Sequence, residues 1–228
     1  IVPGYYHRRD PLGTVYTSTC CPNVASEHVM AQKLMIDSCV LWARHYKVDG
    51  FRFDLMGHHS RDNMVAVREA LDALTVERDG VDGRQVTMYG EGWNFGEVAD
   101  NARFLQASSG QLGGTQIATF SDRLRDAVRG GGPFDDDPRL QGFGTGLMTA
   151  SNGAAGNGNG YDQKDRLLYY GDLIQLGLAG NLRDVVFTSQ LHCSGVRGDQ
   201  IEFQGGPAGY ADEPDEAETA RRRELYWK

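Results

Sequence analysis

Three features are absent from this sequence, and each absence excludes a class of protein. No apolar run approaches the roughly 20 residues that cross a bilayer, so the sequence predicts no membrane span. No basic block is large enough to neutralise a row of phosphates, and the formal net charge of −8 argues against nucleic acid as a partner. The amino terminus, IVPGYY, has no initiator Met, basic leader or apolar signal core, so we expect a cut end and no readable targeting signal.

Cysteine is also scarce. Cys20 and Cys21 are adjacent, while Cys39 and Cys193 stand alone. Without a CxxC motif or a paired Cys/His spacing, the sequence predicts no zinc site and no other metal site. We expect free thiols in a core or a loop. Free thiols favour a reducing compartment, such as the plastid or the cytoplasm, over secretion.

The stretch VDGFRFDLMG, residues 48 to 57, is the one around which the chain is organised. Val48, Phe51 and Phe53 are strand-forming residues, and Gly57 with a polar segment follows, which is typical of a parallel strand covered on both faces. Arg52 and Asp54 are two residues apart, so a strand points both side chains the same way. An arginine beside an aspartate favours the ionised carboxylate that a nucleophile requires.

A second carboxylate ends the next apolar run, VTMYGEGW, residues 86 to 93. Glu91 follows Asp54 by 37 residues, about the length of one βα unit. Adjacent parallel strands bring their carboxyl ends together, so Asp54 and Glu91 are expected to face each other across roughly 5 to 5.5 Å, the separation of a retaining glycosidase pair. The alternative from spacing alone is a structural Arg52–Asp54 ion pair and a Glu91 that caps backbone.

Both stretches resemble a known enzyme family. GFRFD, which contains Asp54, and YGEGW, which contains Glu91, are similar to the second and third signature regions of glycoside hydrolase family 13, the α-amylase superfamily. Three longer runs resemble its pullulanase and limit dextrinase branch: VPGYYHRR at 2 to 9, ASEHVMAQKLMIDSCVLWARHYKVDGFRFDLMGHHSRDNM at 25 to 64, and YGEGWNFGEV at 89 to 98. The resemblance covers most of residues 1 to 190.

The resemblance implies an α/β fold, a partial TIM (β/α)8 barrel to which this chain contributes the middle βα units. Residues 1 to 228 would then be one partial catalytic domain, with a Gly- and Asn-rich insertion at about 131–160 over the catalytic face. The family's first and fourth signature regions, which supply a third carboxylate and two histidines, have no counterpart here. The resemblance therefore leaves open whether the chain alone is active.

The resemblance also implies a reaction, the retaining hydrolysis of α-1,6-glucosidic branch linkages in pullulan, limit dextrins, amylopectin or glycogen. Asp54 would be the nucleophile, Glu91 the general acid/base and Arg52 the support of the nucleophile, with a branched α-glucan as the partner. No cofactor is required by the sequence, and calcium is possible by resemblance without assignable ligands. The alternatives are another family 13 enzyme of isoamylase, α-amylase or branching type, or a non-catalytic glucan-binding remnant.

Two further residues are candidates for substrate binding. His58 lies four residues past Asp54, where relatives often place a residue that reaches the acceptor side of the cleft. Trp93 offers a flat apolar face for a sugar ring. The alternatives are a structural or solvated histidine and a tryptophan packed in the core.

The remaining pattern predicts helices between the strands. The first runs from about 26 to 46 with Met30, Leu34 and Leu41 on its buried stripe, and the second from about 61 to 74. In the second helix, Met64, Val67, Leu71 and Leu74 recur at helical spacing and should face the sheet. QIATF predicts another strand, SDRLRDAVRGGG a helix with Phe120, Leu124 and Val128 inward, 161 to 178 a long helix, and DVVFTS a strand.

Overall fold

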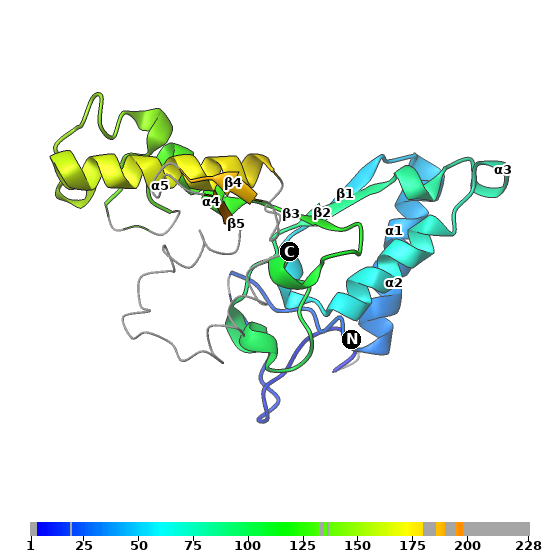
Figure 1. Cartoon of the computed structure of the whole chain (residues 1–228). Coiled ribbons are helices and arrows are strands. Elements are labelled where there is room, and N and C mark those ends of the chain that lie inside the picture. The colour runs from blue at the N-terminus through cyan, green and yellow to red at the C-terminus, as the bar shows by residue number, and fades with distance from the viewer. Residues whose placement is uncertain are drawn as a thin grey trace. The chain divides into compact units, whose positions relative to one another are not determined.

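The computed structural model describes residues 4–18, 20–132, 135, 137–179, 186–189 and 195–197. The chain divides into two compact units, and the boundary lies between Phe120 and Ser121. We refer to the described residues up to Phe120 as the first unit and to those from Ser121 onward as the second unit. Figure 1 shows the elements of both.

The first unit is an α/β structure built on a short parallel sheet. Its helices and strands are α1 (Val29–Tyr46), β1 (Gly50–Phe53), α2 (Arg61–Asp72), α3 (Val76–Asp79), β2 (Thr87–Gly90) and β3 (Ala118–Thr119). Four 3₁₀ turns lie in the connections: η1 (Met56–His58), η2 (Gly83–Gln85), η3 (Gly96–Asn101) and η4 (Ser109–Gln111). The strands pair in the order β1-β2-β3, all parallel. The α/β class and the strand-helix alternation expected from the sequence are confirmed.

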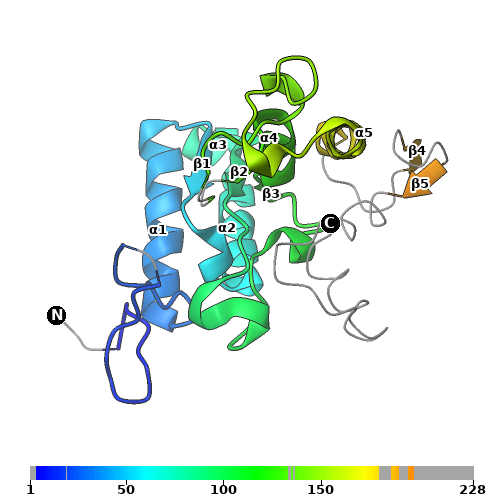
Figure 2. The same ribbon diagram turned by 90° about the vertical axis from the view of Figure 1, so that its left-hand side faces the viewer.

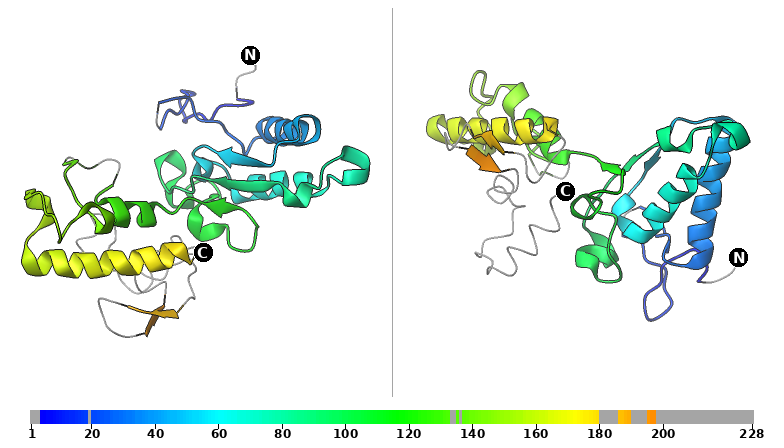
Figure 3. Two further views of the ribbon diagram at one scale, coloured as in Figure 1. Left: turned by 90° about the horizontal axis from the view of Figure 1, so that it is seen from above. Right: turned by 45° about the vertical axis from the view of Figure 1, so that its right-hand side comes forward.

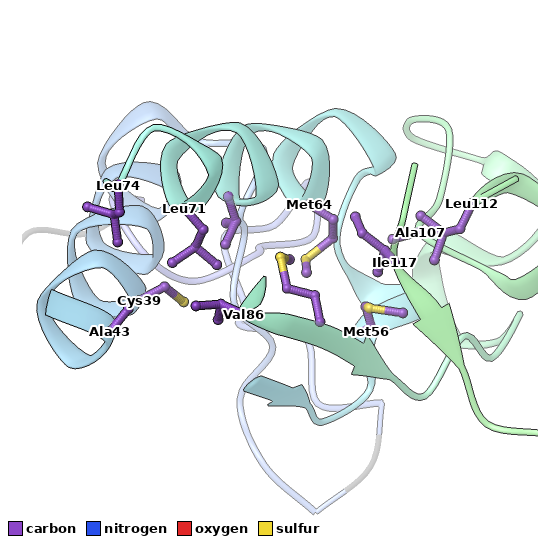
Figure 4. Close-up of a cluster of buried hydrophobic side chains, with 12 residues drawn as sticks. Cys39, Ala43, Met56, Met64, Leu71, Leu74, Val86, Ala107, Leu112 and Ile117 are labelled. Carbon is purple, nitrogen blue, oxygen red and sulfur yellow. The ribbon is translucent and has the colours of Figure 1, made fainter. Parts of the chain in front are cut away.

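Helices α1 and α2 lie side by side against one face of this sheet (Figures 2 and 3). The hydrophobic core fills the space between the helices and the strands, and Figure 4 shows its side chains. Its buried members are Cys39, Ala43, Met56, Met64, Val67, Leu71, Leu74, Val86, Met88, Ala107, Leu112 and Ile117. Met64, Val67, Leu71 and Leu74 thus face the core as predicted, because they share one stripe of the helix and its end.

The predicted buried stripe of α1 is wrong. Met30, Leu34 and Leu41 are exposed, whereas Ala31, Cys39 and Ala43 are buried. The larger residues that pack against the core are Met35, Ile36 and Val40, which are partly buried. The buried face of α1 therefore lies along a different line from Met30, Leu34 and Leu41.

The prediction that the cysteines are free thiols is also wrong for one pair. Cys20 and Cys21 form a disulfide between adjacent residues in the loop before α1, while Cys39 is a free, buried cysteine. Burial raises the pKa of the Cys39 thiol to about 11, so this thiol is protonated at neutral pH. Cys193 lies outside the described residues.

The second unit contains two packed helices and a short antiparallel strand pair. Its elements are α4 (Asp122–Arg129), η5 (Phe143–Thr145), η6 (Ala155–Asn157), α5 (Gly160–Leu178), β4 (Val186–Thr188) and β5 (Gly195–Arg197). Ala127 of α4 and Leu173 of α5 form a small buried cluster with partly buried neighbours from α5. Val128 is exposed, so its predicted inward orientation is wrong, since Ala127 occupies the buried side of α4.

The segment between α4 and α5 contains a network of neutral amide side chains. The Asn157 side chain is fully buried; its Oδ1 accepts from the Gln141 backbone N–H at 2.8 Å, and its Nδ2 donates to Gln141 Oε1 at 3.1 Å and Asn152 Oδ1 at 2.8 Å. Gln141 Nε2 in turn donates to the carbonyls of Thr145 and Ala150. We call Gln141, Asn152 and Asn157 the Asn157 cluster. The Gly- and Asn-rich composition thus specifies a hydrogen-bonded loop in the described part of 131–160.

In the described part of the chain, none of the helices is long and apolar enough to cross a membrane. Among the same residues, no group of three or more His, Cys, Asp or Glu side chains is arranged to hold a metal ion.

Candidate active site

The two candidate carboxylates follow the ends of neighbouring parallel strands. Arg52 pairs with Tyr89 and Phe53 with Gly90 in the register of β1 and β2, so Asp54 and Glu91 come next on either side. The Glu91 backbone N–H continues the ladder by donating to the Phe53 carbonyl at 3.2 Å. The sequence argument that places both side chains at the carboxyl edge of one sheet therefore agrees with the strand register.

Arg52 connects the two carboxylates. Its Nη1 donates to Asp54 Oδ1, and its Nη2 forms an ion pair with Glu91 Oε1 at 2.9 Å. The hydrogen bond to Asp54, together with the charge of Glu91, raises the pKa of the guanidinium. Arg52 therefore contacts Glu91 as well as Asp54, the carboxylate that the sequence paired with it.

The surroundings of the two carboxylates differ. The Asp54 side chain is 76% exposed, whereas the Glu91 side chain is 19% exposed. Glu91 Oε2 also accepts the backbone N–H of Leu55 at 2.9 Å, and the Glu91 carbonyl accepts the N–H of Gly57 at 2.9 Å. Leu55 adopts a left-handed backbone conformation with φ of 46°, which is unusual for a residue other than glycine. This bend immediately after Asp54 turns the Leu55 N–H toward Glu91.

An aromatic pair lies beside Arg52 at the same edge. Phe120 follows β3, and its ring centroid lies 5.5 Å from Arg52 Cζ. The Phe120 and Tyr89 rings meet edge to face with centroids 5.6 Å apart. Phe120 is exposed, so the prediction that it faces inward from a helix is wrong. The sequence does carry a signal for its position, because Phe120 ends the QIATF run, just as Asp54 and Glu91 follow the ends of their strands.

The predicted substrate-binding residues have unequal access to solvent. His58, in η1, is 5% exposed, and its ring packs on Phe95 with centroids 4.6 Å apart. Burial lowers the pKa of His58. Trp93 is half-buried in the segment between β2 and η3. Trp93 thus retains accessible surface, whereas His58 lies behind the ring of Phe95.

A buried ion cluster beneath these loops was missed from the sequence. Arg8 is 1% exposed; its Nε and Nη2 donate to the two carboxylate oxygens of Glu27 at 2.9 and 2.7 Å, and its Nη1 donates to Glu97 Oε1 at 2.8 Å. Glu97 also accepts from Ser18 Oγ and from Asn23 Nδ2, the latter at 2.8 to 2.9 Å. We call these five residues the Arg8 cluster. Charged side chains are seldom fully buried unless they are paired. Arg8 meets this condition, because it is paired with both Glu27 and Glu97.

The cluster sets the charge of Glu97. Burial raises the pKa of Glu97, but hydrogen bonds from Ser18, Arg8 and Asn23 outweigh this effect and lower the pKa to about 2. The Glu27 carboxyl pKa is also lowered, since the Arg8 bonds outweigh the effect of burial. Burial alone would lower the pKa of Arg8, but the two glutamates raise it by more, so the net pKa lies above the ordinary value for arginine. One buried cation thus holds two carboxylates ionised.

Comparison with known proteins gives a consistent result. No family model matches the chain. A curated chloroplastic pullulanase 1 from Arabidopsis thaliana is 46% identical over 217 residues, which is 95% of this chain and 22% of that protein. A pullulanase from Klebsiella pneumoniae is 41% identical over 95% of this chain and 19% of its own length. The Klebsiella pneumoniae pullulanase structure with maltotriose aligns with a TM-score of 0.72 and 39% identity, covering 92% of this chain and 19% of that chain.

The chain therefore spans about a fifth of the length of the curated relatives that it matches. The resemblance to pullulanases expected from the GFRFD and YGEGW stretches is confirmed, and it extends along nearly the whole chain.

Proposed function

We propose that this chain, which is similar over 95% of its length to about a fifth of a pullulanase, carries the two catalytic carboxylates of a retaining α-1,6-glucosidase. The substrates are branched α-glucans: pullulan, limit dextrins, amylopectin or glycogen. The observation that carries the proposal is the guanidinium of Arg52 joining Asp54 and Glu91 at the carboxyl ends of adjacent parallel strands. Paired carboxylates at this position are what a retaining glycoside hydrolase requires.

The two carboxylates take different roles. Asp54 attacks the anomeric carbon and forms a glycosyl–enzyme ester, while Glu91 gives its proton to the leaving glycosidic oxygen. Glu91 then removes a proton from water, which attacks the anomeric carbon and releases Asp54 as a free carboxylate. The 76% exposure of Asp54 suits a nucleophile that a sugar must reach.

The acid role of Glu91 depends on losing solvent. In the substrate-free site, Arg52 and the Leu55 N–H both stabilise the Glu91 carboxylate. Glu91 is already the less exposed of the pair, and a glucan bound above it excludes the remaining water from the oxygen that donates the proton. Asp54 keeps its hydrogen bond to Arg52.

We assign the first sugar contact to Trp93 and Phe120. Trp93 is half-buried and Phe120 is exposed beside Arg52, so each offers accessible ring surface for stacking on a sugar. His58 remains a candidate on the substrate side of the proposed site. Because it is 5% exposed and packs on Phe95, we propose that it supports the site from below the surface.

The proposed fold is a (β/α)8 barrel in which residues 1–228 form part of the catalytic domain and the 131–160 segment is an insertion. Support comes from the parallel order β1-β2-β3 and from the exposed sheet residues, such as Arg52, Tyr89 and Ala118. A parallel sheet is normally covered on both faces. Further barrel strands would enclose the face that carries these residues.

For cellular location, the argument from free thiols no longer holds, because Cys20 and Cys21 form a disulfide. The plastid and the cytoplasm remain the two proposed locations, and the chloroplastic relative from Arabidopsis thaliana supports the plastid.

The deciding experiment is a segment exchange. The chain replaces the matching segment of the Klebsiella pneumoniae pullulanase, and reducing-sugar release from pullulan and from amylose is measured for the hybrid. We expect maltotriose from pullulan, and a loss of at least about 10³-fold in rate for Asp54→Asn with little change in the unfolding temperature. Asp37→Asn, in an exposed ion pair with Lys33, is the matched control and should keep full activity.

Each other outcome contradicts part of the proposal. Cleavage of amylose but not pullulan by the hybrid would assign an α-1,4-specific family 13 activity. Binding of both glucans without turnover would assign a non-catalytic glucan-binding module. Retained turnover in Asp54→Asn would remove Asp54 as the nucleophile.

A further inference from the structure

The Arg8 cluster connects the loops that follow both catalytic strands. Arg8 Nη2 donates to the carbonyl of His58, which lies in η1 after β1, at 2.9 Å. Arg8 Nη1 donates to Glu97, which lies in η3 after β2. The guanidinium also packs on the ring of Phe104, 5.2 Å from its centroid. A single buried side chain thus holds both connections.

A continuous series of hydrogen bonds leads from Arg8 to Glu91. Arg8 donates to the His58 carbonyl, the His58 N–H donates to the Leu55 carbonyl, and the Leu55 N–H donates to Glu91 Oε2, each at 2.9 Å. The middle link is the 3₁₀ turn η1. Any shift of His58 is therefore transmitted to the backbone donor that holds the proposed general acid.

Stability alone does not explain a buried arginine with two carboxylates. Taking such ions out of water is costly, and apolar replacements of similar volume are often as stable or more stable. A guanidinium provides a rigid set of N–H donors whose directions fix its partners, which an apolar side chain does not. The arrangement is suited to fixing the geometry of the loops that it joins.

We propose that Arg8 is a positioning residue for Glu91, acting through His58 and Leu55. This inference rests on the proposed function, since it assigns Glu91 the role of general acid. Reacting groups must be held closely, and a displacement of about 1 Å costs on the order of 10²-fold in rate. Arg8 touches neither substrate nor reacting atoms.

The test uses Arg8→Lys, which keeps the charge and loses the planar donor set. Arg139→Lys is the matched control, because Arg139 also binds both oxygens of one carboxylate, Asp137, but on an exposed surface. In the hybrid enzyme, Arg8→Lys should lower kcat on pullulan by about 10- to 100-fold with little change in KM. Arg139→Lys should leave both unchanged.

The pH profile separates positioning from a merely structural role. Arg52 forms an ion pair with Glu91. The charges of Asp54 and Tyr89 in turn act on the Arg52 guanidinium, whose pKa they raise. None of them changes in Arg8→Lys. If the Leu55 N–H moves away, Glu91 loses a donor to its ionised form, so the alkaline limb of the kcat profile should shift upward by about 0.5 to 1 pH unit.

A second measurement does not depend on activity. Amide hydrogen exchange in the 228-residue chain should accelerate at Leu55 and His58 in Arg8→Lys by about 10-fold or more, and remain unchanged in Arg139→Lys. Unchanged exchange at both amides, or an unchanged kcat and pH profile in a folded Arg8→Lys hybrid, would overturn the positioning role. If the unmodified hybrid is inactive, the proposed function has failed, and the exchange experiment alone decides the link from Arg8 to Leu55.

Discussion

Each unit of the molecule contains a buried polar cluster, and the cluster of the first unit is charged whereas that of the second is neutral. The Arg8 cluster consists of one cation and two carboxylates with their hydrogen-bond donors, whereas the Asn157 cluster consists of neutral amides. Arg8 reaches partners 19, 50 and 89 residues away. Asn157 reaches side chains 5 and 16 residues away. The charged cluster therefore joins distant segments, and the neutral one closes a single loop.

The difference shows how the choice of polar group follows from the distance to be spanned. Joining segments far apart in sequence costs more chain entropy than closing a short loop, and charge-assisted hydrogen bonds are roughly twice as strong as neutral ones. Neutral amides are sufficient within a local loop and are insensitive to pH. The hydrogen bonds of the Arg8 cluster are stronger because they are charge-assisted. They therefore depend on Glu97 being ionised.

The largest expected effect is that of Arg8→Met. Removal of the cation leaves the carboxylates of Glu27 and Glu97 in the cluster without their shared partner, and breaking a buried ion pair typically costs about 3 to 5 kcal/mol. Amide exchange at core positions of the first unit, such as Met64, measures the loss. A decrease below about 1 kcal/mol would show that water enters the cluster and solvates both glutamates.

A smaller effect is expected for Asn157→Ala in the second unit. The substitution leaves the Gln141 backbone N–H without its acceptor and removes the donors to Gln141 Oε1 and Asn152 Oδ1. Groups left unsatisfied in this way cost about 1 to 3 kcal/mol. Exchange at the amide of Leu173 measures the change, and the amide of Met64 in the first unit should not respond.

Asn157→Asp sharpens the same comparison by placing a charge in the neutral cluster. The new carboxylate faces the side-chain oxygens of Gln141 and Asn152, which raises its pKa in the folded state. Its penalty should therefore be present at neutral pH and should disappear as the pH falls through the raised folded pKa toward the unfolded value. A penalty independent of pH would show that the new carboxylate has turned toward solvent.

The last comparison is the pH dependence of the unsubstituted protein. The pKa of Glu97 is lowered in the folded state from its ordinary value of 4.5 to about 2. Its contribution is therefore complete above pH 4.5 and is lost as the pH falls from about 4.5 to about 2. Exchange in the first unit should show this loss, Glu97→Gln should flatten it, and the Asn157 cluster should not contribute.

The features that could be predicted from the sequence depend on local rules. Arg52 and Asp54 lie on one side of a strand because side chains alternate, and Glu91 lies beside them because one βα unit returns the chain to the same edge. The buried stripe of α2 follows from helical spacing. In each case, fewer than 40 residues separate the groups, and secondary structure alone brings them together.

The features that could not be predicted depend on packing between segments distant in sequence. Nothing near Arg8 indicates that it is buried, because its partners His58 and Glu97 lie 50 and 89 residues further along. On α1, helical periodicity alone did not reveal that close packing would bury Ala31 and Ala43 and leave Leu34 exposed. Side-chain size and local polarity do not encode these choices.

The 89-residue separation between Arg8 and Glu97 also has a consequence for biosynthesis. Arg8 leaves the ribosome 89 residues before Glu97 does, so the segment between them emerges with these charges still hydrated. The cluster is completed only after β1, α2 and β2 have all been synthesised. We therefore expect its contacts to be absent from the folding transition state, so that Arg8→Lys accelerates unfolding and leaves the refolding rate nearly unchanged. Stopped-flow refolding and unfolding in urea would measure both rates. The Arg8 cluster would then form last and slow the unfolding of a fold that is already in place.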